Sequence, residues 1–379
     1  MTTKINNEHK KLNVPNLRFP EFQGEWEKCK LGDLCNVLMC KRILASQTNT
    51  EEGVPFYKIG TIGNAPDAYI SKELFDDYKT KYNYPHKGEV MITCAGTVGK
   101  CVIYDGKDAY YQDSNIVWID NPSQCISNSF LYHLLAKVDW RKLNSTTIIR
   151  IYNDDLRNLK LSYPQIEEQQ KISRLLSLLD ERIATQNKVI DKLQSLIRGL
   201  NNKIFATIQG GKYKLGDIAT ITNGNSNVQD ASTKYKEGLY PFFDRSDDTK
   251  FLPTFLFNKE AIIYPGEGTE FMPRYYNGKF ALHQRCYAIF DFKDFVSPLF
   301  MYFLLQTKNA YFIRNAVGST VPSLRLNTFQ NLKVIIPEEK VQRNIYLFLI
   351  DFEQKLNIEI KFAKSLLQQK QYLLRQMFI

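Results

Sequence analysis

The chain of 379 residues is 44% hydrophobic and 24% charged, a balance that suits two or three globular domains and excludes a disordered or fibrous chain. No stretch approaches the roughly 18 apolar residues of a membrane-spanning helix, and the polar start of the sequence lacks a secretory signal, so we expect a cytoplasmic protein. The net charge of +10 favours a polyanionic partner, because Lys and Arg release the counterions that are condensed on phosphate.

The seven cysteines and four histidines show none of the spacings that bind a metal. Cys-x-x-Cys does not occur, and the histidines lie far apart in the sequence. We therefore predict no metal site, and we expect the cysteines to be free thiols in a reducing compartment.

Five segments follow one another along the chain. The first contains two prolines that prevent a regular helix, two segments are rich in strand patterns, and two show long helical patterns. The predicted boundaries are 1–25 for a leader, 26–163 for a first head, 164–207 for a first helix, 208–336 for a second head and 337–379 for a second helix.

The two heads share a layout. Apolar stretch 88–93 predicts a strand in the first head, and 259–264 predicts its counterpart in the second. Asp105-Gly106 predicts a hairpin turn, and Asn277-Gly278 predicts the matching turn. The heads agree in pattern more than in identity, which indicates one fold with two different surfaces.

Internal repetition supports this layout. Lys-Leu-Gly-Asp at 30–33 returns at 214–217, and Pro164 and Pro337 each precede an acidic, Gln-bearing opening and a long apolar heptad pattern. The chain therefore contains two copies of one head-plus-helix unit. Such an arrangement suits a protein that contacts two sites at a fixed separation.

In both long helices the apolar residues recur in alternating steps of four and three, the spacing of a coiled-coil seam. Two seams in one chain bury each other most simply by antiparallel pairing, although each could instead recruit a separate partner helix. The predicted fold is α+β, with two similar strand-rich heads, two long antiparallel coiled-coil helices between them and an internal pseudo-two-fold repeat. The predicted seam residues are Ile172, Leu176, Leu179, Ile183, Gln186, Ile190 and Leu193 in the first helix, and Leu349, Phe352, Leu356, Glu359, Leu366 and Leu373 in the second.

Two polar residues interrupt the seams at equivalent positions. Gln186 and Glu359 would lie close together in an antiparallel pair, where single polar residues can fix the register. The alternative is that both side chains point to solvent.

No catalytic chemistry is apparent. The stretch from Gly96 to Cys101 is similar to the end of a phosphate-binding loop, but cysteine stands where that pattern needs Gly and again where it needs Ser or Thr. Neither Gly-x-Gly-x-x-Gly nor the Pro-Pro motif of base methyltransferases occurs. Acidic pairs such as Asp154-Asp155 are typical of helix caps and solvated loops rather than of a nuclease.

Polar residues in equivalent loops of the two heads suit DNA contact. Gln and Asn can donate and accept at adenine and Arg can donate twice to guanine, while hydroxyls and further basic residues suit phosphate. The predicted DNA contacts are Lys58, Thr93, Thr97, Lys100, Tyr111, Gln112, Asn115 and Arg150 in the first head, and Arg245, Arg274, His283, Gln284, Arg285, Ser319, Thr320 and Arg325 in the second.

The arrangement resembles the specificity (S) subunit of type I restriction-modification systems over residues 15–379. The exit from the first head is close to that family's Pro-x-x-x-Glu-Gln-x-x-Ile signature, whereas the exit from the second head departs from it by lacking the Glu-Gln pair. The resemblance rests on Val14–Pro20 with Trp26, on the two Lys-Leu-Gly-Asp stretches, on the exit Tyr163–Ile172 and on Gly318–Leu324.

The resemblance implies that the heads are target recognition domains, each reading half of a split, asymmetric double-stranded DNA sequence, and that the helices set the gap between the halves. It also implies two modification (methyltransferase) subunits that methylate adenine with S-adenosylmethionine, and restriction/translocase subunits that use ATP and Mg. Under this reading the chain binds no cofactor and catalyses nothing itself.

Two other classes of function remain open. A self-contained methyltransferase or nuclease would bind S-adenosylmethionine in the isolated chain. A two-headed scaffold for protein partners would show no salt-sensitive binding to DNA.

Overall fold

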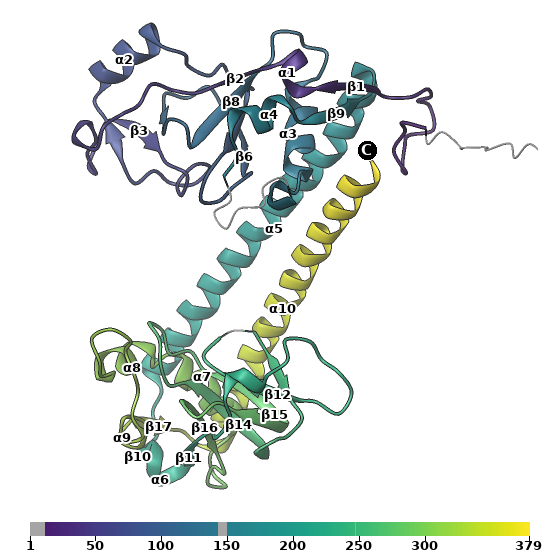
Figure 1. Ribbon diagram of the computed structural model, residues 1–379. Coiled ribbons are helices and arrows are strands. Elements are labelled where there is room, and N and C mark those ends of the chain that lie inside the picture. The colour runs from purple at the N-terminus through teal and green to yellow at the C-terminus, as the bar shows by residue number, and fades with distance from the viewer. Residues whose placement is uncertain (1–11, 143–149, 247) are drawn as a thin grey trace, which may run out of the picture. The chain divides into compact units, whose positions relative to one another are not determined.

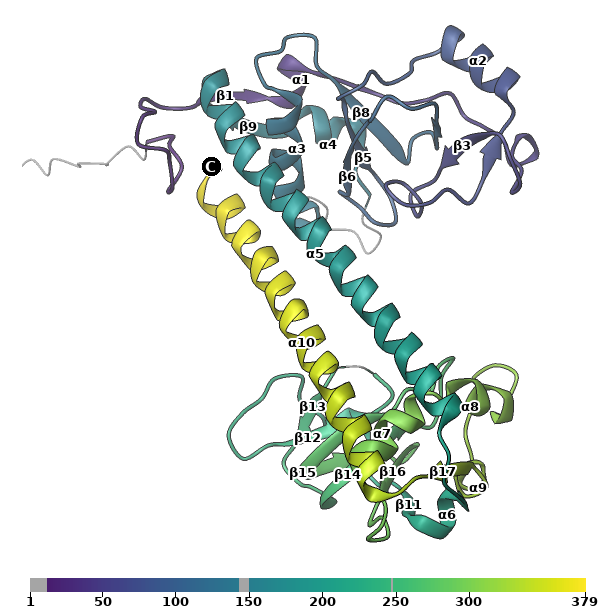
Figure 2. The ribbon, with the colours of Figure 1, turned by 180° about the vertical axis from the view of Figure 1, so that it is seen from behind.

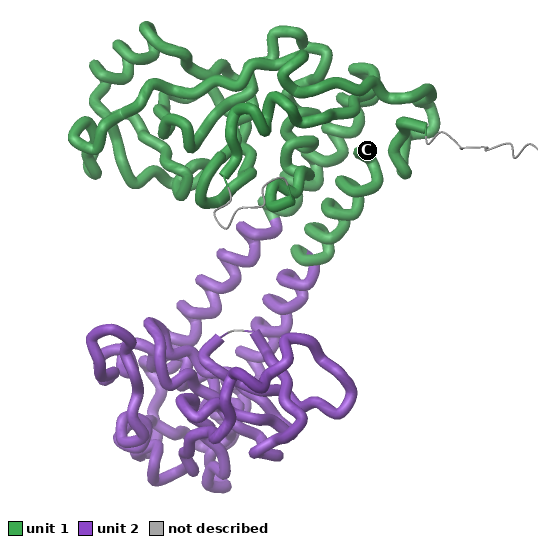
Figure 3. The backbone as a smooth tube through the Cα atoms, in the orientation of Figure 1, with its two compact units in different colours: residues 1–185, 363–379 green, residues 186–362 purple. Residues whose placement is uncertain are grey.

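The computed structural model describes residues 12–142, 150–246 and 248–379, so the first eleven residues of the predicted leader lie outside it. The chain divides into two compact units, each with one head and a part of both long helices (Figure 3). Head 1 runs from the first strand to the start of the first long helix, and head 2 occupies the corresponding stretch of the second half. Unit 1 comprises residues 1–185 and 363–379, and unit 2 comprises residues 186–362.

Head 1 is built on a four-stranded antiparallel sheet of order β2-β8-β5-β6 and a three-stranded sheet of order β4-β3-β7, in which β3 and β7 run parallel. A separate pair, β1 and β9, closes the head where the chain enters and leaves it. The strands are β1 (Glu27–Lys30), β2 (Asn36–Leu38), β3 (Val54–Tyr57), β4 (Tyr69–Ile70), β5 (Val90–Thr93), β6 (Cys101–Ile103), β7 (Tyr110–Tyr111), β8 (Ile116–Asp120) and β9 (Lys160–Tyr163). The helices are α1 (Leu31–Leu34), α2 (Lys72–Lys81), α3 (Asn128–Lys137) and α4 (Asn153–Arg157), with short 3-10 turns at Ala45–Gln47 and Trp140–Lys142.

The central sheet of head 1 is buried on both faces, because successive residues of a strand point to opposite sides. Val90 and Ile92 of β5 pack in one cluster with residues of α3 and of the long helices. Met91, between them, packs in a second cluster with Trp118 and with Phe75 of α2. The long helices thus cover one face of the sheet, and α2 with the smaller sheet covers the other.

Head 2 repeats this plan on a six-stranded sheet of order β11-β16-β14-β15-β12-β13, and β10 pairs with β17 as β1 pairs with β9. The strands are β10 (Gly211–Lys214), β11 (Thr220–Asn223), β12 (Tyr240–Phe243), β13 (Lys250–Leu252), β14 (Phe257–Pro265), β15 (Arg274–Leu282), β16 (Cys286–Phe290) and β17 (Lys333–Ile336). The helices are α6 (Leu215–Ile218), α7 (Pro298–Gln306), α8 (Asn309–Asn315) and α9 (Leu326–Gln330), with a 3-10 turn at Val228–Asp230.

The long helices are α5 (Ile166–Thr207) and α10 (Glu339–Gln376), each lying inside the predicted helical segment, while the outer domain boundaries remain predictions. Within each unit their segments run antiparallel, side by side in Figures 1 and 2. In unit 1, Lys370 of α10 forms an ion pair with Asp180 of α5. The α+β fold with paired antiparallel helices agrees with the predicted class.

The seam residues lie on the buried or half-buried side of both helices. In unit 2, Gln186 is 8% exposed, and its Nε2 donates to Glu359 Oε2 at 2.6 Å and to the Glu359 carbonyl at 3.2 Å. The two polar seam residues therefore meet, and Gln186 does not point to solvent.

Two predicted turns are wrong. Asp105-Gly106 does not join a hairpin, because β6 pairs with β5, whereas β7 pairs with β3 and β8 lies on the other side of β5. Asn277-Gly278 is not a turn at all, because both residues lie inside β15 and pair with Glu260 and Lys259 of β14. A two-residue turn signal is local, and the long-range pairing of the strands overrides it.

No helix in the described part of the chain combines the length and the apolar character needed to cross a bilayer.

Candidate nucleic-acid interface

Three loops of head 1 are joined by hydrogen bonds. The amide of Cys94, in the glycine-rich loop after β5, donates to the Asn115 carbonyl at 2.8 Å. The amide of Ile151 donates to the Cys94 carbonyl at 2.8 Å. Arg150 Nη2 lies 3.5 Å from Ser114 Oγ. The predicted contacts in these loops, Thr97, Gln112, Asn115 and Arg150, therefore share one region of head 1.

The turn after β3 belongs to the same region. Exposed Thr97 donates from Oγ1 to the Ile59 carbonyl at 3.1 Å, and Lys100 Nζ donates to the Ile62 carbonyl at 2.5 Å. Lys58 Nζ lies 3.2 Å from Asp67 Oδ1, and both side chains are largely exposed. Solvent screens such an exposed ion pair, so Lys58 can exchange its partner for a phosphate at little cost.

Gln112 holds an open acceptor. Its amide donates to the Tyr57 carbonyl at 2.9 Å, which fixes the backbone. Its side-chain Oε1 is buried and accepts no hydrogen bond from any described residue. Buried polar atoms are nearly always paired, so an open acceptor is explained if a ligand donates to it.

Two predicted contacts in head 1 need correction. Thr93 has no exposed surface, and its Oγ1 accepts from the Lys100 amide at 3.0 Å, so it shapes the loop and cannot reach a phosphate. Tyr111 is 6% exposed and stacks on Tyr57 with ring centroids 5.8 Å apart, so it belongs to the core. The sequence shows both residues beside polar loops, but their burial depends on how the sheets pack.

In head 2 the predicted residues gather around one recess of about 620 Å³. The β15–β16 turn supplies His283, Gln284 and Arg285, and the turn after β12 supplies Arg245. The His283 amide donates to the Phe243 carbonyl at 2.9 Å, which joins the two turns. Partial burial lowers the pKa of His283, so the imidazole is neutral near pH 7.

Most cations around this recess already have partners. Arg285 Nη1 lies 2.6 Å from Glu267 Oε1, and Lys250 pairs with Asp244. Arg274 donates to two backbone carbonyls of the turn after β12, so the structure assigns it to the scaffold and corrects the prediction that it contacts DNA. Arg245 is exposed and has no ion-pair partner among the described residues.

A second loop lies beside the recess. Ser319 and Thr320 are exposed in a loop whose ends, Val317 and Ser323, pair with each other. Ser323 also pairs with Glu267, whose side chain lines the recess. Arg325 follows in an exposed position before α9. These predicted contacts therefore adjoin the recess without lining it.

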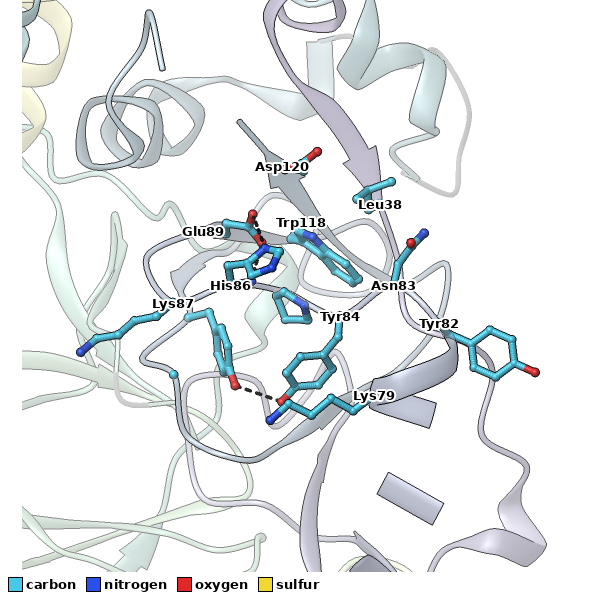
Figure 4. Close-up of a pocket in the computed structure, with 13 residues that line it drawn as sticks. Leu38, Lys79, Tyr82, Asn83, Tyr84, His86, Lys87, Glu89, Trp118 and Asp120 are labelled. Carbon is cyan, nitrogen blue, oxygen red and sulfur yellow. Dashed lines mark hydrogen bonds and ion pairs between the residues drawn. The ribbon is translucent and has the colours of Figure 1, made fainter. Parts of the chain in front are cut away.

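Head 1 has a pocket of about 550 Å³ that is lined by none of the predicted DNA contacts (Figure 4). Trp118 and Tyr84 line its interior, while Tyr82 and Lys87 lie at opposite rims and point outward. Buried Glu89 accepts from the His86 amide at 2.7 Å. The lining comes from several places in the sequence, namely the end of α2 and the stretch after it, β2, the stretch after β6, and β8, so no local pattern indicates the pocket.

One glutamine joins each head to its long helix, a role that the sequence analysis missed. Gln169 is 0% exposed; its Nε2 donates to the Cys125 and Pro164 carbonyls, both at 2.8 Å, and its Oε1 accepts from the Ser127 amide at 2.8 Å. Gln342 is 1% exposed and makes the same three bonds in unit 2: to the Phe295 carbonyl (2.8 Å), to the Pro337 carbonyl (2.9 Å) and from the Ser297 amide (2.8 Å).

The second exit therefore keeps the glutamine of the Glu-Gln pair, and only the glutamate is missing. Glu168 is 1% exposed and accepts from Arg18 of the leader at 2.8 and 2.7 Å. Val341, which directly precedes Gln342 as Glu168 precedes Gln169, is 42% exposed. Glu168 thus binds the leader, whereas the uncharged Val341 cannot form such an ion pair.

Head 1 and head 2 thus share one repeated fold and carry two unlike polar surfaces. Residues 23–195 and 211–366 each match the type I restriction modification DNA specificity domain, and the chain belongs to this family.

Similar proteins include a putative type I restriction enzyme specificity subunit of Haemophilus influenzae, 48% identical over 164 residues that cover 43% of this chain and 42% of the relative. The putative MjaX specificity subunit of Methanocaldococcus jannaschii is 24% identical over 242 residues, which cover 60% of this chain and 57% of the relative. The chain thus spans about half the length of these relatives.

Among solved structures, the type I restriction-modification S subunit from M. genitalium has the same fold, with a TM-score of 0.63 at 18% identity over 97% of this chain and 99% of that one. A chain from a structure of type I restriction-modification complex assembly has a TM-score of 0.51 at 15% identity, over 92% and 96%.

Proposed function

We propose that this chain is the DNA-reading subunit of a type I restriction-modification complex. Head 1 reads one part of a bipartite, asymmetric target in double-stranded DNA, and head 2 reads the other. The observation that carries the proposal is the pairing of one repeated scaffold with two different polar surfaces. Family membership supports the same conclusion.

The proposed contacts are the predicted residues other than Thr93, Tyr111 and Arg274. Amide, imidazole and guanidinium side chains suit base edges, and hydroxyl or basic side chains suit phosphates. They are Lys58, Thr97, Lys100, Gln112, Asn115 and Arg150 in head 1, and Arg245, His283, Gln284, Arg285, Ser319, Thr320 and Arg325 in head 2.

The partners would supply the chemistry. Two modification subunits would methylate adenine with S-adenosylmethionine, restriction/translocase subunits would use ATP and Mg, and this chain would bind none of these cofactors. We also propose a cytoplasmic location, which the seven unpaired cysteines favour.

Apolar side chains exposed on the long helices suit the docking of the modification subunits. In unit 2, α5 exposes Val189 and Leu196, which stand two turns apart on one face, and α10 exposes Phe348 and Ile358. Ile358 is 64% exposed, although an isoleucine on a helix of a free-standing protein is usually buried.

Methylome sequencing of a host that expresses this chain with its modification subunit tests the proposal. We expect a motif with two specified parts around a fixed unspecified gap. Gln112→Ala should relax only one part, and Gln284→Ala only the other. A contiguous palindrome, or no new methylation, would contradict the two-head reading and would favour a protein scaffold.

A further inference from the structure

The turn that follows β12 holds Arg245 in a restrained backbone. Asp244, the preceding residue, is 3% exposed, and its Oδ1 accepts from the amide of Ser246 at 2.8 Å and from its hydroxyl at 2.5 Å. Its Oδ2 forms an ion pair with Lys250 of β13. One buried carboxylate therefore ties both the residue after Arg245 and the neighbouring strand to this turn.

Arg274 of β15 restrains the same turn from the other side. Its Nη1 donates to the Ser246 carbonyl at 2.8 Å, and its Nη2 donates to the Asp244 carbonyl. Its guanidinium also lies 5.1 Å from the centroid of the Phe243 ring. The carbonyls on either side of Arg245 are thus both held by a single guanidinium.

The side chain at the centre of this turn is unengaged. Arg245 is exposed, and no described residue forms a hydrogen bond or an ion pair with it. The other cations of the recess are bound, Arg285 to Glu267 and Lys250 to Asp244. A free cation on a fixed backbone is prepared for a ligand, because little backbone entropy is left to lose when it binds.

We propose that Arg245 reads a guanine in the part of the target that head 2 contacts, by donating two hydrogen bonds to O6 and N7. The inference rests on the proposed DNA-reading function. In the major groove only guanine presents two acceptors side by side, and the planar guanidinium matches them. Adenine, the other purine, offers one acceptor beside a donor, which an arginine cannot satisfy.

Head 1 has no equivalent arginine. β3 pairs in parallel with β7 through Phe56 and Tyr110, as β12 pairs with β15 through Phe242 and Ala281, so the turns after β3 and β12 correspond. In head 1 that turn contains Lys58 and Ile59, and Lys58 lies near Asp67. Arg245 should therefore specify a base in one part of the target only.

The first test compares the assembled modification complex carrying the unaltered chain, Arg245→Ala, Arg245→Lys or Arg314→Ala. Arg314 is another exposed arginine of head 2 and serves as the matched control. For the unaltered chain and for the control we expect one guanine to be specified in the head 2 part. Both Arg245 variants should lose that preference, by roughly 5- to 100-fold in the ratio of Kd values for adenine and guanine at that position.

The lysine variant separates base reading from phosphate contact. Lysine keeps the charge but lacks the planar pair of donors, so a phosphate contact would survive the change and bidentate base reading would not. Retention of full guanine preference by Arg245→Lys, or uniform weakening on all sequences with Arg245→Ala, would overturn the inference.

A second measurement alters the DNA and compares the unaltered complex with the Arg245→Ala complex. Replacing the guanine by 7-deazaguanine removes the N7 acceptor, so affinity should fall for the unaltered complex and should not fall further for Arg245→Ala. An equal loss in both complexes would overturn the inference. A bipartite motif without guanine in the head 2 part would also overturn it and leave the proposed function intact, whereas the absence of any bipartite motif would overturn both.

Discussion

His133 is an uncharged imidazole buried between α3 and α5. It is 1% exposed; its Nε2 lies 3.3 Å from Ser177 Oγ, and its Nδ1 lies 4.0 Å from Asp180 Oδ2. Burial lowers its pKa to about 4, against a partial opposing effect of Asp180. In unit 2 a glutamine contacts a carboxylate of α10, since Gln306 Nε2 donates to Glu353 Oε1 at 2.9 Å.

The buried imidazole makes the stability of unit 1 dependent on pH. The folded pKa of about 4 lies below the ordinary value of 6.5, so the unfolded chain takes up the proton first as the pH falls. The neutral imidazole contributes fully to the free energy of unfolding above pH 6.5. This contribution, on the order of 3 kcal/mol, is lost as the pH falls towards 4.

His133→Gln should remove this part of the acid sensitivity, because an amide side chain does not titrate. Hydrogen exchange of the α3 amides between pH 7 and 4.5 measures it: protection should fall more steeply in the unaltered chain than in the variant. His86→Gln is a matched control, because the His86 side chain is 85% exposed. Equal loss of protection in all three chains would contradict the prediction.

At the scale of elements, Gln342 holds three parts of unit 2 together: the end of β17, the segment before α7 and the first turn of α10. Gln342→Met keeps the length of the side chain but leaves two carbonyls and one amide buried without partners. Each unpaired group costs about 1–3 kcal/mol, so we expect the free energy of unfolding of unit 2 to fall by roughly 3 kcal/mol or more.

Proteolysis of the chain at increasing urea concentrations would measure this loss, with cleavage within unit 2 as the sign that unit 2 has unfolded. Val341→Ala, at the exposed neighbouring position, should leave the midpoint unchanged and serves as the control. A Gln342→Met chain as resistant as the control would show that water replaces the lost bonds.

The exposed apolar residues of α10 allow a second prediction at this scale. Ile358→Glu should weaken binding of the modification subunit at least tenfold, because the proposed interface would then bury an unpaired charge. Asn357→Glu, also exposed on α10 but on another face, should bind normally. Isothermal titration with the purified modification subunit distinguishes the two, and equal affinities would exclude this face of α10 from the interface.

The elements also show what the sequence could reveal. A seam repeated over 42 residues of α5 and 38 of α10 is a local signal, so it predicts both helices and their pairing. The partners of β6 and β15 depend on residues far along the chain, and both predicted turns failed for that reason. The predictions for Thr93 and Tyr111 were wrong likewise, because both sides of β5 and of β7 are buried in head 1. The role of Gln169 and Gln342 could not be predicted, because hydrogen bonds from a side chain to backbone atoms produce no pattern of residue types in the sequence.

At the scale of the whole molecule, the repeated design predicts that the gap in the target depends on the length of the helices. Seven residues inserted after Ser195 in α5 and seven after Lys355 in α10 keep the heptad register of both seams. Both positions lie between the Gln186–Glu359 contact and the contacts of head 2, namely Asn201 with Gln306 and Glu353 with Tyr302, so each head keeps its own supports.

One heptad adds about 10 Å of helix, which corresponds to roughly three base pairs of DNA. We expect the doubly extended chain to lose its original target and, where it still methylates, to specify the same two parts around a longer gap. Insertion after Ser195 alone should weaken target reading more severely, because the seam residues of α5 are then shifted by one heptad relative to those of α10. Methylome sequencing gives the gap directly, and circular dichroism shows whether the heads remain folded. An unchanged motif with unchanged spacing would mean that the helices do not set the distance, because nothing in either head would have been altered.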